Sequence, residues 1–298
     1  MKTNKKQVFI KSIVISFCAI ITFIVADWCL TATDRYQVFP VNPKDTFGKR
    51  GVLFGEIDET KKSVIIMGCS FGFGVDLKDG QTLPDKIQTM TGRKTLNLAY
   101  PAHGIQHVLY KIKNFDEFNN EVENAEYVIY IFITDHLRRL YLNYFDKYAQ
   151  YKYLRYIKKN NTLIENNFSV VPLDYFKTTT IARRSNDFFY TLKSDDEKFD
   201  FLKMHILESQ KELKKKNPNC KFVTIVYNTS VTSERMGVAN FHTDRWTELE
   251  DEGIIVINFD TAKYDFLNED KYIAQDELHP SEAAWDRLMP TIIRRLKL

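Results

Sequence analysis

Short apolar runs alternate with segments of helical spacing over most of the chain. The runs are rich in Val, Ile, Phe and Tyr and are bounded by polar or glycine positions, which is typical of strands buried on both faces of a parallel sheet. We expect such strands at 62–67, 95–98, 127–134, 221–227 and 253–259. We expect helices at 83–90, 105–118, 197–216, 244–250 and 281–296, with Pro280 suited to the first helical position of the last one. This alternation predicts an α/β fold, a doubly wound parallel sheet with helices on both faces.

The N-terminal residues 1–30 read as a membrane segment. Three lysines precede an apolar stretch at 8–30, in which Lys11 and Asp27 are the charged positions. Its uninterrupted core, 12–26, is shorter than the roughly 20 residues of a spanning helix, but the length suffices when Lys11 extends its ammonium group to the interface. No small-residue cleavage site follows, so we expect an uncleaved single-pass anchor, with a cleaved signal segment as the alternative. The N-terminal lysines place the start of the chain inside the cell and the remainder outside the cytoplasm.

Two further segments depart from the alternation. Residues 31–61 contain scattered Pro and Gly without sustained periodicity, so we expect a linker that leads into a domain at 62–298. Residues 137–195 form an insertion rich in Tyr and Phe. Within it, Asn160-Asn161 between two short apolar pairs predicts a small hairpin. The aromatic side chains of the insertion either form a lid or platform for a substrate or make a small core of their own.

The chemistry of the sequence is concentrated at two distant places. Ser70 follows the first strand on a glycine-rich turn, at the carboxyl end of the strand, where open α/β sheets place their ligands. Asp276 and His279 lie three residues apart, just before the last helix. A serine hydroxyl becomes nucleophilic through a neighbouring base, and the base is oriented by a carboxylate. The sequence therefore supplies the three groups of a Ser-His-Asp triad.

Three short blocks carry a resemblance to the SGNH (GDSL-type) hydrolases. Residues 68–74, Gly-Cys-Ser-Phe-Gly-Phe-Gly, are similar to the family's first block, which contains the nucleophile. Residues 276–280, Asp-Glu-Leu-His-Pro, are similar to the last block, which contains the other two triad members. Residues 97–104 are similar to the second block, whose glycine, here Gly104, would donate its backbone N–H to the oxyanion hole together with that of Ser70. The resemblance implies a flavodoxin-like three-layer sandwich and a serine esterase.

The sequence departs from the family pattern in two blocks. Cys69 replaces the usual aspartate before the serine. The third block, normally Gly-x-Asn-Asp, should follow the strand at 127–134, and the chain reads Thr134-Asp135-His136 there, without the asparagine that completes the oxyanion hole. Asp135, His136 and Arg138 are candidates for contacts with the substrate or the oxyanion. A guanidinium near the pocket, that of Arg138 or of Arg139, can replace the missing asparagine as a charge-assisted donor. A purely structural role for these residues is the alternative.

Composition removes several other classes of function. The net charge is +3, from 42 basic and 39 acidic residues, and gives no electrostatic case for binding nucleic acid. No His, Cys and Asp residues have the spacing of metal ligands, and we expect no metal and no cofactor. The four cysteines form no disulfide framework, and we interpret all of them as free thiols: Cys18, Cys29, Cys69 and Cys220.

The function predicted from these observations is two-step acyl transfer. We expect an esterase that acts on an O-acyl ester, with an O-acetylated glycan of the cell envelope as the substrate implied by the resemblance and by the membrane segment. An O-acyltransferase that passes the acyl group to a sugar hydroxyl is the first alternative. A catalytically inactive glycan-binding or assembly protein on the same fold is the second, because a fold can persist after its chemistry is lost.

Overall fold

The computed structural model describes residues 21–22, 56–141, 156–160, 162–165, 190–238 and 241–298. All of the expected membrane segment except residues 21–22, most of the linker and much of the aromatic insertion lie outside these residues. Within the described ranges, no helix combines the length and the apolar character that crossing a membrane would require. The end of the linker, from residue 56, runs against the domain, where the Asp58 N–H donates to the Gly92 carbonyl over 2.7 Å.

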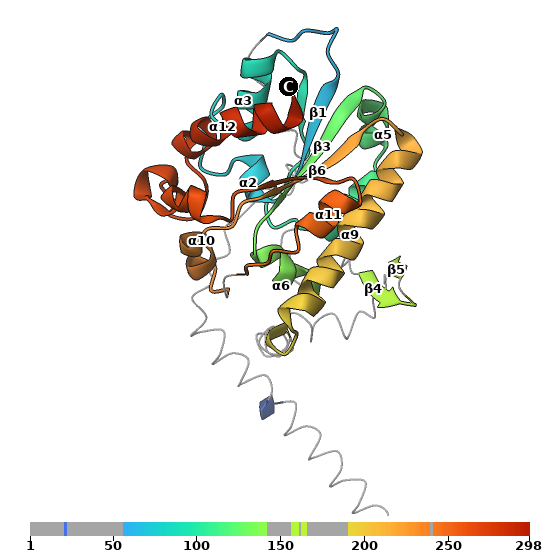
Figure 1. Ribbon diagram of the computed structural model, residues 1–298, viewed down its shortest axis with the longest axis vertical. Helices are drawn as coiled ribbons and strands as arrows, with labels where there is room; N and C mark the ends of the chain where they lie inside the picture. The colour runs from blue at the N-terminus through green and yellow to red at the C-terminus, as the bar shows by residue number, and fades with distance from the viewer. Residues whose placement is uncertain (1–20, 23–55, 142–155, 161, 166–189, 239–240) are drawn as a thin grey trace, which may run out of the picture.

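A five-stranded sheet forms the centre of the domain, with every pairing parallel and the strand order β2-β1-β3-β6-β7 (Figure 1). The strands are nearly continuous apolar runs because helices cover both faces of the sheet; all six residues of β1, for example, are buried. The strands are β1 (Ser63–Gly68), β2 (Thr95–Asn97), β3 (Ala125–Phe132), β6 (Lys221–Val226) and β7 (Ile255–Asn258). The predicted α/β fold with a parallel sheet is confirmed.

Two hydrophobic clusters, one on each face of the sheet, hold the layers together. Figure 1 shows α3 and α12 on one side of the sheet and α9 on the other. The first face is covered by α3 (Leu83–Thr91) and α12 (Glu282–Leu296), and the opposite face by α4 (Ile105–Asn114), α5 (Asp116–Val122), α6 (Asp135–Tyr141), α9 (Asp195–Lys216) and α11 (Thr247–Asp251).

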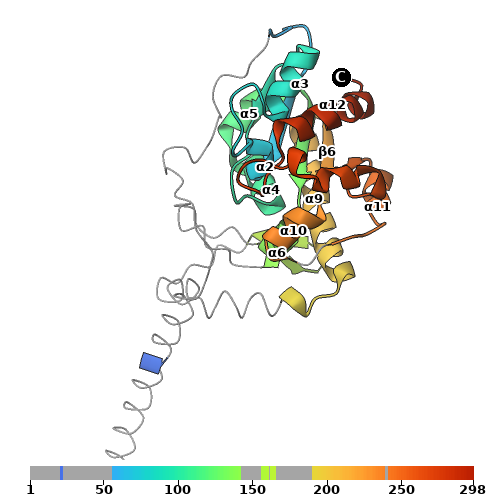
Figure 2. The ribbon, with the colours of Figure 1, turned by 90° about the vertical axis from the view of Figure 1, so that its left-hand side faces the viewer.

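Short helices follow several strands at the carboxyl edge of the sheet. Figure 2 shows α6 and α10 together at one end of the domain, the end at which β3 and β6 finish. The short elements in this region are α2 (Ser70–Phe73), α10 (Ser230–Arg235), η2 (Ala262–Asn268) and η3 (Asp270–Tyr272). They were not expected from the sequence, because segments of one or two turns carry too little periodicity to be recognised.

Most predicted elements are found within two or three residues of their expected bounds, and two details of the prediction are wrong. The helix expected at 105–118 is interrupted at Phe115, whose backbone is extended (φ −97°, ψ 118°). The last helix does not take Pro280 as its first residue. Ser281 is the N-cap, its Oγ accepts the Ala284 N–H at 3.3 Å, and the helix begins at Glu282. A serine hydroxyl can satisfy a helix N–H in this way, which proline cannot.

The expected hairpin is confirmed as a separate two-stranded antiparallel sheet. It consists of β4 (Tyr156–Lys159) and β5 (Thr162–Glu165), and Ile157 is paired with Ile164. Asn160 has a φ of 48°, in the left-handed region that asparagine tolerates better than most residues.

Candidate active site

The turn that carries Ser70 depends on two glycines. Gly68 ends β1 with a φ of 125°, and a Cβ at this position would lie 3.2 Å from the Ile131 carbonyl oxygen of the neighbouring strand. Gly72 lies in α2, where a Cβ would be 3.0 Å from the Cβ of Ala99. Side chains at either position would push the turn away from the sheet. The glycines therefore fix half-buried Ser70 at the carboxyl end of β1.

Asp276 and His279 form a hydrogen-bonded pair in the loop before α12. The carboxylate Oδ2 of Asp276 contacts Nδ1 of the His279 ring, and Oδ1 accepts the backbone N–H groups of Leu278 and His279, each at 3.0 Å. Burial by itself would raise the pKa of Asp276, but these hydrogen bonds outweigh it and lower the pKa to about 2. The carboxylate is therefore ionised at neutral pH and holds the imidazole with its Nδ1 toward the carboxylate and its Nε2 on the opposite side.

Backbone hydrogen bonds fix the loop that carries this pair. Its two sides meet in an antiparallel bridge between Ile273 and Pro280, and the Ala274 N–H donates to the His279 carbonyl over 2.7 Å. At its tip, the Asp276 N–H donates to a carboxylate oxygen of Asp76 at 3.0 Å. These contacts hold both members of the pair in a single arrangement.

The His279 ring lies beside the turn that carries Ser70. The ring centroids of His279 and Phe71, the residue after Ser70, are 5.1 Å apart. His279 is only 8% exposed, and its Nε2 is buried without a hydrogen-bond partner in the described part of the chain. No hydrogen bond joins this nitrogen to Ser70 within the described residues, so the base and the serine are neighbours without the closed contact of a working triad. Catalytic hydrogen bonds are often longer in free enzymes than in substrate complexes.

Gly104, the expected oxyanion donor, uses its N–H for another contact. This N–H donates to Nδ1 of His107 over 3.1 Å. The His107 ring is stacked on that of His103, with centroids 4.2 Å apart and planes 4° apart. Burial lowers the pKa of both histidines, that of His107 to about 3, so both imidazoles are neutral and Nδ1 of His107 can accept. An incoming oxyanion would compete with His107 for the Gly104 N–H.

The third block holds the second block in place through Arg139, a positioning role that the sequence analysis did not predict. The Asp135 carboxylate is 2.6 Å from Arg138 and 2.7 Å from Arg139, and all three side chains are at most 10% exposed. Arg139 also donates to the His103 carbonyl at 2.9 Å. This carbonyl and the Gly104 N–H belong to one planar peptide group, so Arg139 fixes the direction of both. The i, i+4 spacing of Asp135 and Arg139 on a helix was the signal that could have identified the pair.

The remaining third-block residues face inward. The Thr134 hydroxyl donates to Oδ1 of Asn228, so it is engaged with the end of β6. His136 is fully buried, and its Nδ1 lies 2.6 Å from the hydroxyl of Tyr130. Burial holds the pKa of His136 well below its usual range. In this conformation His136 packs in the core, whereas Asp135 and Arg138 lie in the buried ion pairs beneath the second block.

The two described cysteines, Cys69 and Cys220, are buried free thiols, and burial raises the pKa of both. Among the described residues, no three His, Cys, Asp or Glu side chains are grouped so as to hold a metal ion. Cys18 and Cys29 lie outside the described residues.

Comparison with known proteins gives likeness of fold. No protein-family model and no curated protein matches this chain. A member of the lipolytic protein G-D-S-L family from Veillonella parvula is 12% identical, with a TM-score of 0.42 over 78% of this chain and 95% of that one. An acetylxylan esterase from Geobacillus stearothermophilus is 11% identical, with a TM-score of 0.44 over 83% and 97% of the two chains. A psychrotrophic esterase from Pseudoalteromonas is 13% identical, with a TM-score of 0.42 over 80% and 97%. The chemistry of this chain therefore rests on its own residues.

Proposed function

We propose that this protein is a serine esterase that removes O-acyl groups, in particular O-acetyl groups, from a glycan of the cell envelope. Ser70 is the nucleophile, His279 is the general base, and Asp276 orients the base. The observation that carries this proposal is the Asp276–His279 pair: an ionised carboxylate holds one ring nitrogen, while the other is buried, unpaired within the described chain and beside the serine turn.

The proposed reaction proceeds in two steps. Oγ of Ser70 attacks the ester carbonyl carbon while Nε2 of His279 takes the hydroxyl proton, and the same nitrogen then returns the proton to the departing sugar oxygen. Water next attacks the acyl-serine; it gives one proton to His279, which passes it back to Oγ as the carboxylic acid leaves. Asp276 remains ionised and stabilises the imidazolium that forms in each step.

The N–H groups of Ser70 and Gly104 are the proposed oxyanion donors. Arg139 supports this role because it orients the 103–104 peptide, and Asp135 supports it because it holds Arg139. The Gly104 N–H must exchange Nδ1 of His107 for the oxyanion, which is the stronger acceptor because it is charged. A missing side-chain donor typically costs about 3 kcal/mol of barrier, and we expect turnover to be modest for this reason.

Two alternatives start from the same site. An O-acyltransferase would use the same acyl-serine and pass the group to a sugar hydroxyl instead of water. The non-catalytic glycan-binding protein is favoured by one observation, the engagement of the Gly104 N–H with His107. A labelled acetyl donor, incubated with the protein and an oligosaccharide, distinguishes the transferase from the esterase. Label on the sugar indicates a transferase, and label in free acetate indicates an esterase.

A fluorophosphonate probe with intact-mass analysis tests whether Ser70 is activated. We expect a single covalent adduct on the wild-type chain and none on Ser70→Ala. The His279→Ala variant should be labelled far more slowly, because Ser70 then lacks the base that takes its proton and no other thiol or hydroxyl group is activated in its place. Absence of an adduct on the wild-type protein at high probe concentration would contradict the esterase and favour the non-catalytic alternative.

The proposed location is the outer side of the cytoplasmic membrane, with 8–30 as a single-pass anchor. The lysine-flanked apolar segment supports this proposal. The full-length protein should stay with membranes through high-salt and carbonate washes, whereas a chain that begins near Thr31 should be released. A mature N-terminus near Ala32 would identify a cleaved signal segment instead.

A further inference from the structure

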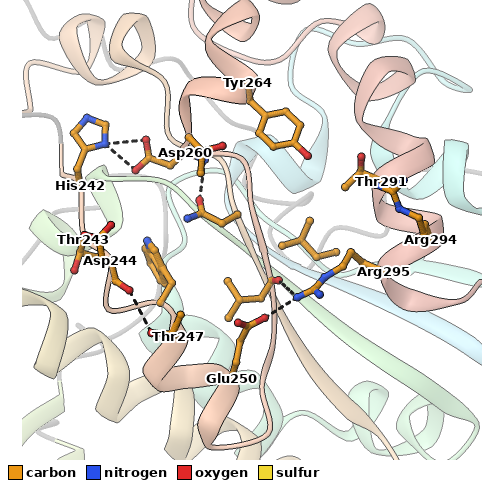
Figure 3. A pocket seen from close by; sticks show the side chains of 15 residues that line it. His242, Thr243, Asp244, Thr247, Glu250, Asp260, Tyr264, Thr291, Arg294 and Arg295 are labelled. Atoms are coloured by element: carbon orange, nitrogen blue, oxygen red, sulfur yellow. Dashed lines mark hydrogen bonds and ion pairs between the residues drawn. The ribbon is translucent and has the colours of Figure 1, made fainter.

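A cavity whose lining includes none of Ser70, Asp276 and His279 lies along strand β7. It has a volume of about 570 Å³ and opens between α11 and the C-terminal half of α12 (Figure 3). A smaller cavity of about 270 Å³ adjoins it at the carboxyl end of β7. The two cavities share four lining residues: His242, Asp260, Thr261 and Tyr264. Together the two cavities are called the β7 trough. Their volumes fall within the range of about 300–1,000 Å³ that is usual for small-molecule sites, or just below it.

The trough is not suited to an added peptide strand, although β7 is the last strand of the described sheet. The Val256 carbonyl accepts a hydrogen bond from Nη2 of Arg295 at 3.0 Å. The Asp260 N–H donates to Oδ1 of Asn258 at 2.8 Å. An added strand would have to displace these side chains, since it binds through free N–H and carbonyl groups of a sheet edge.

The charges of the trough favour a neutral ligand. Four carboxylates and three basic side chains line it: Asp244, Glu250, Asp260, Asp265, His242, Arg294 and Arg295. Arg295 pairs with Glu250 at 2.6 Å, and His242 pairs with Asp260 at 2.9 Å. Asp244, Asp265 and Arg294 form no ion pair with any described residue, so two carboxylates and one guanidinium stay available. A phosphate or another polyanion would be repelled by the carboxylates, and a metal ion by the guanidinium groups.

The other lining groups fit a molecule with many hydroxyls. Thr243, Thr247 and Thr291 contribute hydroxyl groups. The Thr247 hydroxyl donates to the Asp244 carbonyl at 3.4 Å and can still accept, whereas the Thr243 hydroxyl accepts the Arg245 N–H at 3.2 Å and can still donate. Figure 3 shows the Tyr264 ring directed toward the cavity from the opposite side to Thr247. Trp246 also lines the trough, and its buried Nε1–H has no acceptor among the described residues. A pyranose offers ring hydroxyls to such groups and a C–H face to an aromatic ring.

One short helix connects the trough with the candidate active site. Asn228, two residues after the end of β6, donates to Oδ2 of Asp260 over 3.3 Å. Helix α10 follows, and the Thr232 hydroxyl on it donates to the Leu278 carbonyl over 3.5 Å. Leu278 lies between Asp276 and His279 of the proposed triad. The trough and the loop that carries Asp276 and His279 therefore both contact helix α10.

We propose that the β7 trough binds a neutral saccharide segment of the substrate, at a distance from the ester bond that is cleaved. This inference rests on the proposed function for its link to the reaction, and binding itself can be tested without turnover. The saccharide chain of the substrate would then contact the β7 trough in addition to the site at Ser70.

The test uses the full chain in detergent with the Ser70→Ala substitution, which removes turnover. Xylotetraose and chitotetraose are titrated against it by calorimetry. We expect at least one of them to bind, and we expect Asp244→Ala and Tyr264→Ala each to weaken binding about tenfold, the loss typical of a hydrogen bond to a charged group or of a ring contact. Two matched controls, Lys62→Ala and Tyr110→Ala, remove an exposed lysine and a half-buried tyrosine outside the trough and should not change the affinity.

Several outcomes would overturn the proposal. These are no binding of either saccharide, equal loss with trough and control variants, or binding of inorganic phosphate or of an extended peptide in place of the saccharides. A separate assay on a small aryl acetate keeps the two proposals apart. If the protein hydrolyses the aryl ester but binds no saccharide, the esterase proposal stands and the trough proposal fails. If the protein binds saccharide through Asp244 and Tyr264 but does not hydrolyse the ester, the trough proposal stands and the esterase proposal fails.

Discussion

Two histidine–aspartate pairs lie near the carboxyl edge of the sheet, and their surroundings differ. His279 has a side chain that is 9% exposed and an Nε2 that is buried without a partner in the described chain. His242 has a side chain that is 62% exposed, and its Asp260 partner is 8% exposed. In the first pair the imidazole is sheltered beside a serine turn; in the second the carboxylate is sheltered and the imidazole meets solvent.

The two carboxylates are also perturbed in opposite directions. Backbone and side-chain hydrogen bonds lower the pKa of Asp276 in spite of its partial burial, whereas burial raises the pKa of Asp260 in spite of its contacts with Asn228 and His242. A histidine–aspartate contact alone therefore does not define a catalytic base. We propose that the neighbouring serine, the N–H groups around the carboxylate and the burial of the second ring nitrogen distinguish the pair that takes a proton from Ser70.

The largest effect that separates the two pairs should come from removing each imidazole. His279→Ala should lower kcat on a small aryl acetate by about a thousandfold or more, because the proton of Ser70 then has no acceptor. His242→Ala should lower it far less. Steady-state kinetics on both variants, with near-UV circular dichroism to confirm folding, measures the difference. Similar losses for the two substitutions would remove His279 from the proposed role.

The next effect concerns the peptide that Arg139 orients. Arg139→Lys should lower kcat about 10- to 100-fold with a smaller change in KM, because a lysine cannot hold both the Asp135 carboxylate and the His103 carbonyl in the same geometry. Titration of active sites with the fluorophosphonate counts the folded, competent fraction. A loss of activity that is fully explained by fewer labelled sites would indicate that Arg139 supports folding alone.

The third effect is the dependence of stability on acid. The folded-state pKa of Asp276 is about 2 against an ordinary value of 3.8, so this carboxylate stabilises the fold above pH 4 and its contribution disappears as the pH falls toward 2. Because Asp276 is partly exposed, solvent screening reduces this contribution to about 1 kcal/mol. Asp260 has the opposite sign, because its pKa is raised: through this group the fold gains stability on acidification and loses it as the pH rises through the raised pKa.

Urea unfolding between pH 7 and pH 2.5 measures these contributions. Asp276→Asn should remove part of the decline in unfolding free energy on acidification, while Asp260→Asn should make the decline steeper. Equal slopes in the wild type and in Asp276→Asn would mean that the pair with His279 does not exist in solution.

The smallest effect concerns α10, which lies between the two pairs. Arg235 on this helix contacts Glu277, which lies between Asp276 and His279 in the loop before α12. The side chains of Arg235 and Glu277 are 35% and 78% exposed. Exposed ion pairs of this kind contribute at most about 1 kcal/mol. Arg235→Ala should therefore lower Tm by only a few degrees and change kcat less than about threefold. A loss of more than tenfold in kcat would show that the loop depends on this contact for its position.

The sequence by itself determined the parts of this protein in which a local pattern reports burial or turn geometry. Strands covered on both faces appear as apolar runs, and the parallel sheet could be predicted from them. The turn before Ser70 needs glycine because its backbone approaches Ile131, and the i, i+3 spacing of Asp276 and His279 lets the two side chains meet within one loop. Asn160 marked the hairpin for a similar local reason.

Only the tertiary structure decided which polar groups meet across the fold. The contact of Arg139 with the His103 carbonyl, the pairing of His242 with Asp260 and the hydrogen bond from Thr134 to Asn228 join residues on different elements. Hydrophobic periodicity carries no information about such partners, because a buried polar group can be satisfied by any suitable donor or acceptor that packing brings within about 3 Å. For the same reason the resemblance could only predict Gly104 as an oxyanion donor, whereas packing of the 103–107 segment placed Nδ1 of His107 against its N–H.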